Sequence, residues 1–321
     1  MAVGSSNSFD LVVLGAGTGG YSAAFRAGQL GLKVALVDEV KIGGTCLHTG
    51  CIPTKAMLES ADLYDKIRHA ADFGIALTDP RIEFATIAAR RQQVVDRLTK
   101  GLMSLVKKNK VEFIRGRGTL QSAKKVKVAK LDDEGAPAGD IVLEGTDVIV
   151  ATGSRVKSLP GLTPDGERIV TSDDVLRSET LPKSLIIVGA GAVGVEFASF
   201  YRDMGVEVTV LEYLPAIVPL EDADVSKELE RSFSKRGIKV MTNARFDPAS
   251  VTSDERGVCV MVGKEGEKPQ ELRADQMLVA TGRAANTDGV GLENTRAKVE
   301  KGMVLVDHRM RTAEPHLYAI G

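Results

Sequence analysis

One pattern occurs twice in this chain: an apolar run, a glycine turn, a helical stretch, and a second apolar run ending in an acid. The first turn begins at Gly15 and its acid is Asp38; the second turn begins at Gly189 and its acid is Glu212. In both copies the acid lies 23 residues after the first glycine. Short β-branched runs are typical of strands buried in parallel sheets. The duplication therefore predicts an α/β fold with two doubly wound domains.

Both turns have the pattern G-x-G-x-x-G, and their surroundings indicate Rossmann-like dinucleotide binding. The first glycine permits a tight turn, the second lets a pyrophosphate approach the backbone, and the third allows helix and strand to pack closely. The helix N-terminus faces the phosphates, and the acid accepts hydrogen bonds from a ribose. A turn that merely packs is the alternative for either copy alone. Two copies with equal spacing argue against it.

The acid of the second copy indicates which nucleotide binds there. A carboxylate at Glu212 suits the free 2′-hydroxyl of NAD and repels the 2′-phosphate of NADP. Enzymes that prefer NADP usually carry an arginine nearby. Here Tyr213 and Leu214 follow, with no arginine, so we expect NAD.

Length and composition indicate the class of protein. A chain of 321 residues suggests about two domains, and its formal net charge of -1 gives no indication of nucleic acid binding. No stretch is apolar over the length needed to span a bilayer, and the first ten residues lack a signal-peptide apolar region. Three cysteines do not make a secreted disulfide scaffold. We expect a cytoplasmic enzyme, with an organelle matrix as the alternative location, that binds neither nucleic acid nor membrane.

Two of the cysteines, Cys46 and Cys51, lie in the loop after the first unit. A zinc half-site is a poor interpretation because zinc needs a second pair of ligands and Cys259 stands alone, so we expect no metal. A structural disulfide is a second interpretation. We favour a redox pair beside the nucleotide. Pro53 fits the first turn of a helix, which places Cys51 where the helix dipole stabilises a thiolate.

Lys55 lies four residues after Cys51 and therefore one helical turn further along the same side. Its positive charge favours a thiolate or a reduced flavin. A solvated surface lysine is the alternative.

Besides the two glycine turns, the chain contains three further motifs: residues 43–55, Ala151-Thr152-Gly153 and Ala280-Thr281-Gly282. Together they resemble the pyridine nucleotide–disulfide oxidoreductases over essentially the whole chain. The loop from Cys46 to Lys55, with Glu212, looks most like the members that oxidise dihydrolipoamide. Glutathione and mercuric reductases have related loops but usually select NADP.

This resemblance implies a second domain inserted into the first. Residues 1–154 begin an FAD-binding domain, 155–282 form an NAD-binding domain, and 283–321 return to the FAD-binding domain. The residues implied to contact FAD are Gly15, Gly17, Gly19, Gly20, Asp38, Glu39, Gly44, Thr45, Lys55, Gly118, Thr152, Gly153 and Ser154. Those implied to contact NAD are Gly189, Gly191, Val193, Gly194, Glu196, Glu212 and Gly282.

The resemblance also implies catalytic roles. Cys46 exchanges disulfide bonds with the substrate, Cys51 contacts the flavin, and Lys55 pairs with Glu196 near it. Electrons pass from dihydrolipoamide through the Cys46–Cys51 disulfide and FAD to NAD+.

In the family, a run like 312–321 leads into an aspartate that holds the flavin, and then into a dimerisation domain with a His–Glu base. This sequence stops at Gly321, and His69, His308 and His316 match no such motif. We expect a fragment without that domain, impaired in activity, from a homodimer acting on the lipoyl group of a 2-oxoacid dehydrogenase or glycine cleavage complex. Another disulfide reductase, with a different thiol or metal substrate, is one alternative. A non-catalytic dinucleotide-binding redox module is another.

Overall fold

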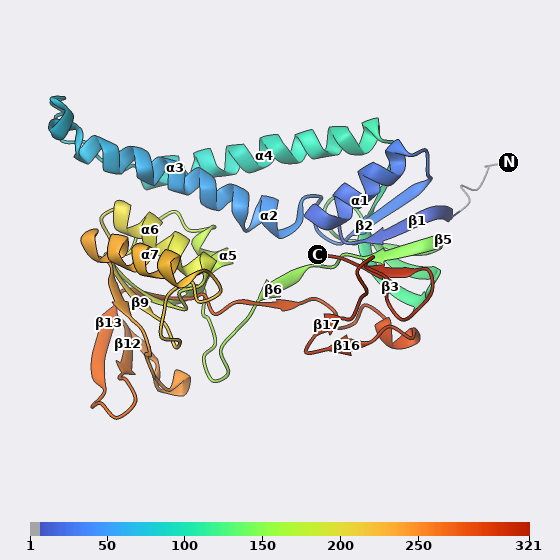
Figure 1. Cartoon of the computed structure of the whole chain (residues 1–321). Coiled ribbons are helices and arrows are strands. Elements are labelled where there is room, and N and C mark those ends of the chain that lie inside the picture. The colour runs from blue at the N-terminus through green and yellow to red at the C-terminus, as the bar shows by residue number, and fades with distance from the viewer. Residues whose placement is uncertain (1–6) are drawn as a thin grey trace. The chain divides into compact units, whose positions relative to one another are not determined.

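The computed structural model describes residues 7–321, which form two compact units (Figure 1). The first unit contains residues 7–48, 95–155 and 284–321, and the second contains 49–94 and 156–283. The second unit is thus inserted into the first, and the predicted fold class, two doubly wound Rossmann-like domains, is confirmed.

The first unit is built on a six-stranded sheet. Four parallel pairings give the spatial order β3-β2-β1-β5-β18, and β4 pairs antiparallel with the second half of β3 and the first half of β5. The strands are β1 (Ser8–Leu14), β2 (Val34–Asp38), β3 (Glu112–Ser122), β4 (Lys125–Leu131), β5 (Pro137–Val150) and β18 (Leu317–Ala319). Short strands β16 (Val299–Glu300) and β17 (Met303–Val304) form a separate hairpin, preceded by the 3₁₀ turn η3 (Leu292–Asn294).

Helices cover this sheet because its central strands are apolar on both faces. In β1, Val12 and Leu14 belong to one buried cluster and Leu11 and Val13 to another. Helix α1 (Thr18–Gln29) joins β1 to β2 and contributes to the second cluster. The short α2 (Gly44–His48) follows, and the long α4 (Phe84–Lys108) gives its second half to this unit.

The second unit has a five-stranded parallel sheet of order β10-β9-β8-β14-β7. Its strands are β7 (Ile169–Thr171), β8 (Ser184–Val188), β9 (Glu207–Leu211), β10 (Lys239–Met241) and β14 (Gln276–Val279). Helix α6 (Ala192–Asp203) joins β8 to β9, and α7 (Ala223–Lys235) joins β9 to β10. The order of the strands switches direction between β8 and β14, and open α/β sheets bind ligands at such a point.

Residues 49–94, which the sequence analysis placed in the FAD-binding domain, pack within the second unit. Helix α3 (Cys51–Arg68) brings Met57 and Ala61 into the same buried cluster as Phe197 and Tyr201 of α6. The apolar face of α3 therefore completes the core beside the second glycine turn. The remaining short elements are η1 (Ala70–Phe73), β6 (Ser154–Val156), α5 (Ser172–Val175), η2 (Pro248–Ser250) and β15 (Arg283–Ala285).

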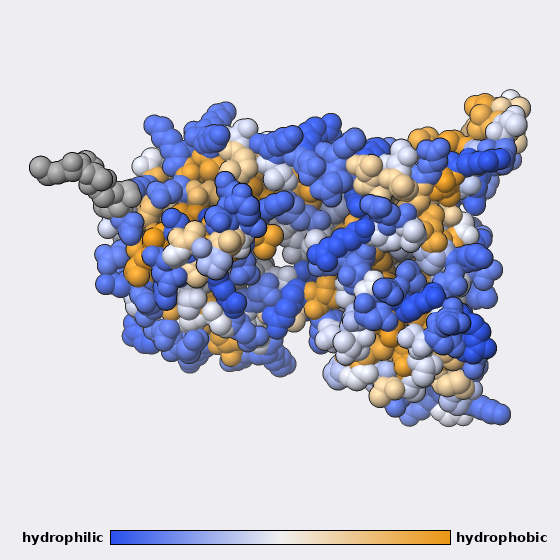
Figure 2. Space-filling model, turned by 180° about the vertical axis from the view of Figure 1, so that it is seen from behind, coloured by the Kyte–Doolittle hydropathy of each residue, from blue (hydrophilic) through white to orange (hydrophobic). Residues whose placement is uncertain are grey.

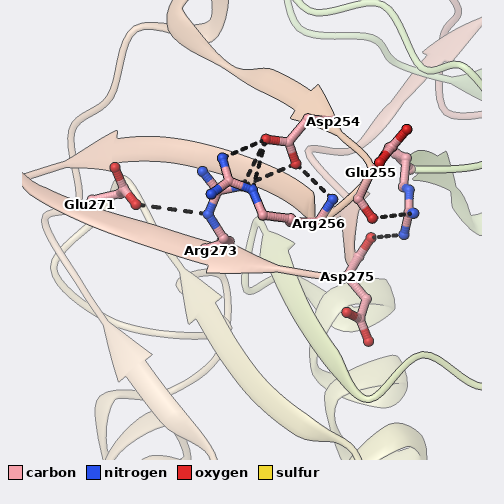
Figure 3. Close-up of polar contacts among 7 residues, drawn as sticks. Asp254, Glu255, Arg256, Glu271, Arg273 and Asp275 are labelled. Atoms are coloured by element: carbon pink, nitrogen blue, oxygen red, sulfur yellow. Dashed lines mark hydrogen bonds and ion pairs between the residues drawn. The ribbon is translucent and has the colours of Figure 1, made fainter.

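A small antiparallel sheet completes the second unit: β11 (Thr252–Asp254), β12 (Gly257–Val262) and β13 (Gln270–Ala274). On its exposed side the Asp254 carboxylate accepts hydrogen bonds from Arg256 and Arg273 (Figure 3). A hydrogen bond from Arg256 lowers the pKa of Asp254. Arg168 donates to the carbonyl oxygens of Glu255 and Asp275 and so ties this sheet to the start of β7.

The surface contains an apolar patch after α3. Phe73, Ile75 and Leu77 each expose half or more of their surface. Figure 2 shows apolar side chains at the end of the helical segment that contains α3. Exposed apolar groups of this kind are typical of contact surfaces. Over residues 7–321, no helix has the length and apolar character needed to cross a membrane.

Candidate nucleotide and disulfide site

The first glycine turn follows β1, and close backbone contacts leave no room for a side chain at two of its glycines. Gly15 has a φ of 102°, and a Cβ there would lie 2.1 Å from the carbonyl oxygen of Ala151. A Cβ at Gly20 would lie 1.8 Å from the carbonyl oxygen of Gly15. At Gly17, by contrast, the nearest atom to a Cβ is the Gly44 Cα at 3.8 Å, an ordinary contact. Packing within the protein does not require a glycine at 17, whereas a phosphate approaching this backbone does.

The second turn, after β8, repeats this geometry. Gly189 has a φ of 101°, and its Cβ would lie 2.5 Å from the carbonyl oxygen of Ala280. A Cβ at Gly194 would lie 1.9 Å from the Gly189 carbonyl oxygen, while a Cβ at Gly191 meets nothing within 4 Å. In both turns packing within the protein would tolerate a Cβ at the middle glycine, and both turns fit a dinucleotide pyrophosphate.

The helices that follow the two turns begin at glycine caps, which offer no side chain to their first N–H groups. Gly17 caps α1 and Gly191 caps α6; neither cap has a side-chain hydrogen bond, and neither first turn contains an acid. The N–H groups of a first helical turn, at the positive end of the helix dipole, favour an anion. This is a second observation that favours phosphate binding at both turns.

The acids at the ends of β2 and β9 make matching hydrogen bonds. The Asp38 carboxylate accepts the N–H groups of Ala16 at 2.7 Å and Val40 at 2.9 Å. The Glu212 carboxylate accepts the N–H groups of Ala190 at 2.7 Å and Leu214 at 2.8 Å, and Glu212 is only 7% exposed. Each carboxylate oxygen has a further lone pair for a ribose hydroxyl.

The segment after β5 forms the other wall of the first turn. The Thr152 hydroxyl donates to the Asn286 carbonyl oxygen at 2.6 Å, and the Asn286 amide donates to the Thr152 carbonyl oxygen at 3.1 Å. The Asn286 backbone N–H donates to the Gly153 carbonyl oxygen. Asn286 therefore braces the wall, a role that the sequence analysis missed. In the second unit, Gly282 has a φ of 112° and open space at its Cα.

The cysteine-bearing loop is held against the first turn. The Gly43 N–H donates to the Ala16 carbonyl oxygen at 2.8 Å. A Cβ at Gly44 would lie 2.5 Å from the Gly17 Cα. Thr45 and Cys46 follow directly in α2, so the loop presents them beside the backbone of the first glycine turn. Cys46 is half-buried.

Helix α3 begins at Cys51, as Pro53 in its first turn predicts, and Cys51 is exposed. Cys51 lies in the second unit and Cys46 in the first. The Lys55 ammonium forms an ion pair with the Glu196 carboxylate of α6. The structure thus contains the ion pair that the resemblance implies, and its place beside a flavin stays a prediction.

Other implied contacts have simpler local explanations. A Cβ at Gly118 in β3 would lie 2.6 Å from the Leu14 Cδ2, so packing alone requires that glycine. Val193 packs against the core of the second unit, and Glu39 is exposed. A Cβ at Gly19 would lie 3.4 Å from the Ile320 Cδ1. Ser154 begins β6. Their cofactor contacts stay predictions.

Comparison with known proteins identifies the class. Residues 9–321 match the family described as pyridine nucleotide-disulphide oxidoreductase, and the chain belongs to that family. Members of this kind use FAD and a nicotinamide dinucleotide. The dihydrolipoyl dehydrogenase of Bacillus subtilis is 43% identical over 320 residues, which are 98% of this chain and 67% of that protein. The enzyme of the same name from Zymomonas mobilis is 41% identical over 98% of this chain and 66% of its own length.

Solved structures support the same family assignment. The crystal structure of LpdA from Mycobacterium tuberculosis has a TM-score of 0.86 at 32% identity, over 97% of this chain and 67% of that one. The HOCl-induced flavoprotein disulfide reductase RclA from Escherichia coli, as its Cu(II) complex, has a TM-score of 0.81 at 26% identity, over 98% and 66% of the two chains. The chain spans about two thirds of the length of these relatives.

Proposed function

We propose that this chain carries the nucleotide-binding domains of a dihydrolipoamide dehydrogenase. Its electrons run from dihydrolipoamide through a Cys46–Cys51 disulfide and FAD to NAD+. The main observation is the hydrogen bond from the Gly43 N–H to the Ala16 carbonyl oxygen, which holds the cysteine loop against a phosphate-binding turn. Relatives named dihydrolipoyl dehydrogenase at about 40% identity support the substrate.

The two turns divide the cofactors between the units. Gly15, Gly17 and Gly20 receive the pyrophosphate of FAD, and Asp38 binds its ribose. In the second unit, the turn at Gly189 and the carboxylate of Glu212 receive NAD. FAD, when bound, supplies a two-electron carrier between the thiols and the nicotinamide.

The thiol chemistry follows from the positions of the two cysteines in their helices. A substrate thiolate attacks the Cys46 sulfur of the disulfide, forming a substrate–Cys46 disulfide and releasing the Cys51 thiolate. The second substrate thiol, losing its proton, attacks the substrate sulfur of that bond. Lipoamide leaves with its own disulfide, and its two electrons remain on Cys46 and Cys51. Because Cys51 starts α3, the dipole of that helix stabilises its thiolate.

The whole protein's partner is the lipoyl group of a 2-oxoacid dehydrogenase or glycine cleavage complex. The full-length protein is a homodimer, and the exposed apolar side chains of Phe73, Ile75 and Leu77 support a further contact surface. The small number of cysteines supports a cytoplasmic location.

A second candidate is reduction of a different substrate. The leghemoglobin reductase of Vigna unguiculata is 39% identical over 98% of this chain, so a relative named for a different activity shares these domains. Titration of the full chain with dihydrolipoamide and with other dithiols separates the two substrates.

The visible spectrum of the purified chain tests the proposal. We expect bound flavin, and new long-wavelength absorbance when dihydrolipoamide is added. Cys51→Ser removes that absorbance, whereas Cys259→Ser, a change in β12, preserves it. A chain that has both cysteines and binds both nucleotides but shows no thiol-dependent spectral change is a redox-inactive module, and the proposal is then wrong.

A further inference from the structure

A cavity of about 470 Å³ lies in the second unit, away from the second glycine turn. Its lining includes Glu167, Gln276 and Tyr201. Glu167 precedes β7, Gln276 begins β14, and Tyr201 lies near the end of α6. The glycine turn at Gly189 follows the opposite, carboxyl end of this parallel sheet. The cavity is therefore separate from the proposed nucleotide site.

The buried part of the cavity wall contains a polar group without a protein partner. The Tyr201 side chain is only 1% exposed, yet no group among residues 7–321 forms a hydrogen bond with its hydroxyl. Burial raises the pKa of this phenol, so the hydroxyl stays neutral and can donate a hydrogen bond. Buried polar groups in folded proteins nearly always have a partner. A bound molecule that accepts a hydrogen bond would supply one here.

Charges of both signs line the same cavity. The Asp174 carboxylate is held in place, because its Oδ2 accepts the Thr171 N–H at 2.8 Å and the Thr171 hydroxyl at 2.6 Å. Its Oδ1 accepts no hydrogen bond from the described part of the chain. Glu167 and Arg177, which also line the cavity, form no ion pair with any residue from 7 to 321. Carboxylates suit an ammonium group and a guanidinium suits a carboxylate.

We propose that this cavity binds a small zwitterion, an α-amino acid with a short apolar side chain. Asp174 and Glu167 bind its ammonium group. Arg177 and the Tyr201 hydroxyl bind its carboxylate, and the two valines of the lining contact its side chain. A simple anion would leave both acids unpaired, and a simple cation would leave Arg177 unpaired. This binding goes beyond the proposed redox function and does not depend on it.

Calorimetric titration of the full chain with three probes tests the proposal. L-Valine carries both charged groups, isobutylamine is the same molecule without the carboxylate, and 3-methylbutanoate is the same molecule without the amine. We expect L-valine to bind about tenfold more tightly than either analogue, because each analogue loses charged hydrogen bonds. A folded chain that does not bind L-valine, or binds it no more tightly than one of the analogues, overturns the inference.

Tyr201→Phe tests the buried hydroxyl. The variant keeps the ring that packs edge-on against Phe200 and removes only the oxygen, so the fold is retained. The affinity for L-valine should fall about tenfold, the range of a hydrogen bond to a charged group. Tyr64→Phe, on α3 of the same unit, is the matched control and should leave the affinity unchanged.

Arg177→Met tests the carboxylate partner. It should weaken the binding of L-valine about tenfold and leave the binding of isobutylamine unchanged, because the amine has no carboxylate to lose. Arg231→Met, an exposed arginine of α7 paired with Glu228, is the matched control. Unchanged affinity for L-valine in either Tyr201→Phe or Arg177→Met overturns the inference. NADH binding should be the same in all four variants, so failure here leaves the proposed function standing.

Discussion

Asp38 and Glu212 hold equivalent hydrogen bonds in the two units. Each accepts the N–H of the second residue of its glycine turn at 2.7 Å, from Ala16 in one case and Ala190 in the other. Both carboxylates therefore fix the turn before any nucleotide arrives. Each acid thus holds the backbone of its glycine turn, and in the proposed function each also receives a ribose.

Asp38→Ala is expected to affect both tasks. The N–H of Ala16 loses its partner, which costs about 1–3 kcal/mol of unfolding free energy if no water replaces it. Flavin retention falls as well, because the ribose loses its acceptor. Urea unfolding and the flavin-to-protein ratio measure the two effects. An unchanged unfolding free energy would show that the hydrogen bond does not stabilise the turn.

Substitutions at two glycines of the second turn are expected to affect folding and NADH binding differently. Gly191→Ala adds a methyl group in open space at a φ of -72°, so the unfolding free energy changes by less than about 1 kcal/mol. NADH binding is nevertheless lost, because the methyl group blocks the pyrophosphate. Gly194→Ala forces a Cβ against the Gly189 carbonyl oxygen and destabilises the fold by about 1–3 kcal/mol or more. Tight NADH binding by Gly191→Ala would contradict the assigned phosphate position.

The Lys55–Glu196 ion pair is expected to contribute to the redox reaction more than to folding. Both side chains are substantially exposed, at 58% and 35%, so the pair contributes only about 0–1 kcal/mol to stability. Glu196→Gln should leave the melting temperature nearly unchanged, while the rate of flavin reduction by dithiol falls about tenfold.

The matched control for this test lies on the same helix. Lys66 pairs with Asp62 on α3, and Lys66→Met should change neither stability nor the reduction rate. Equal rates for wild type and Glu196→Gln would give the Lys55–Glu196 pair a structural role only.

Glu314 provides a test of pH dependence. A hydrogen bond from the Arg296 guanidinium lowers the pKa of Glu314 below its ordinary value of 4.5. The folded state therefore binds this proton less readily than the unfolded state. The resulting stabilisation is present above pH 4.5 and disappears as the pH falls through the lowered pKa. The difference in unfolding free energy between wild type and Glu314→Gln should shrink over that range, and a constant difference would contradict the assignment.

The sequence predicted the local parts of the site well. Glycine turns, the acids that follow them and the start of α3 near Pro53 each depend on residues close together in the chain, and their backbone requirements are specific. The packing of residues 49–94 with the second unit was not predicted, because it depends on contacts of Met57 and Ala61 with α6, more than a hundred residues away.

Two polar contacts were missed for the same reason. Asn286 braces Thr152 across 134 residues, and Arg245 reaches Tyr213 across 32 residues. Neither residue stands in a motif, since a contact between distant segments leaves no periodic signal in either. The sequence analysis considered only the residues that follow Glu212 in the chain, so it did not find the contact of Arg245 with Tyr213.

The close approach of Gly44 to Gly17 has an evolutionary consequence. With backbone against backbone, a side chain added at position 44 would displace the first glycine turn, and a bulkier residue at 17 would press on the loop that carries Cys46. Changes that retune the thiol chemistry must therefore leave this junction intact.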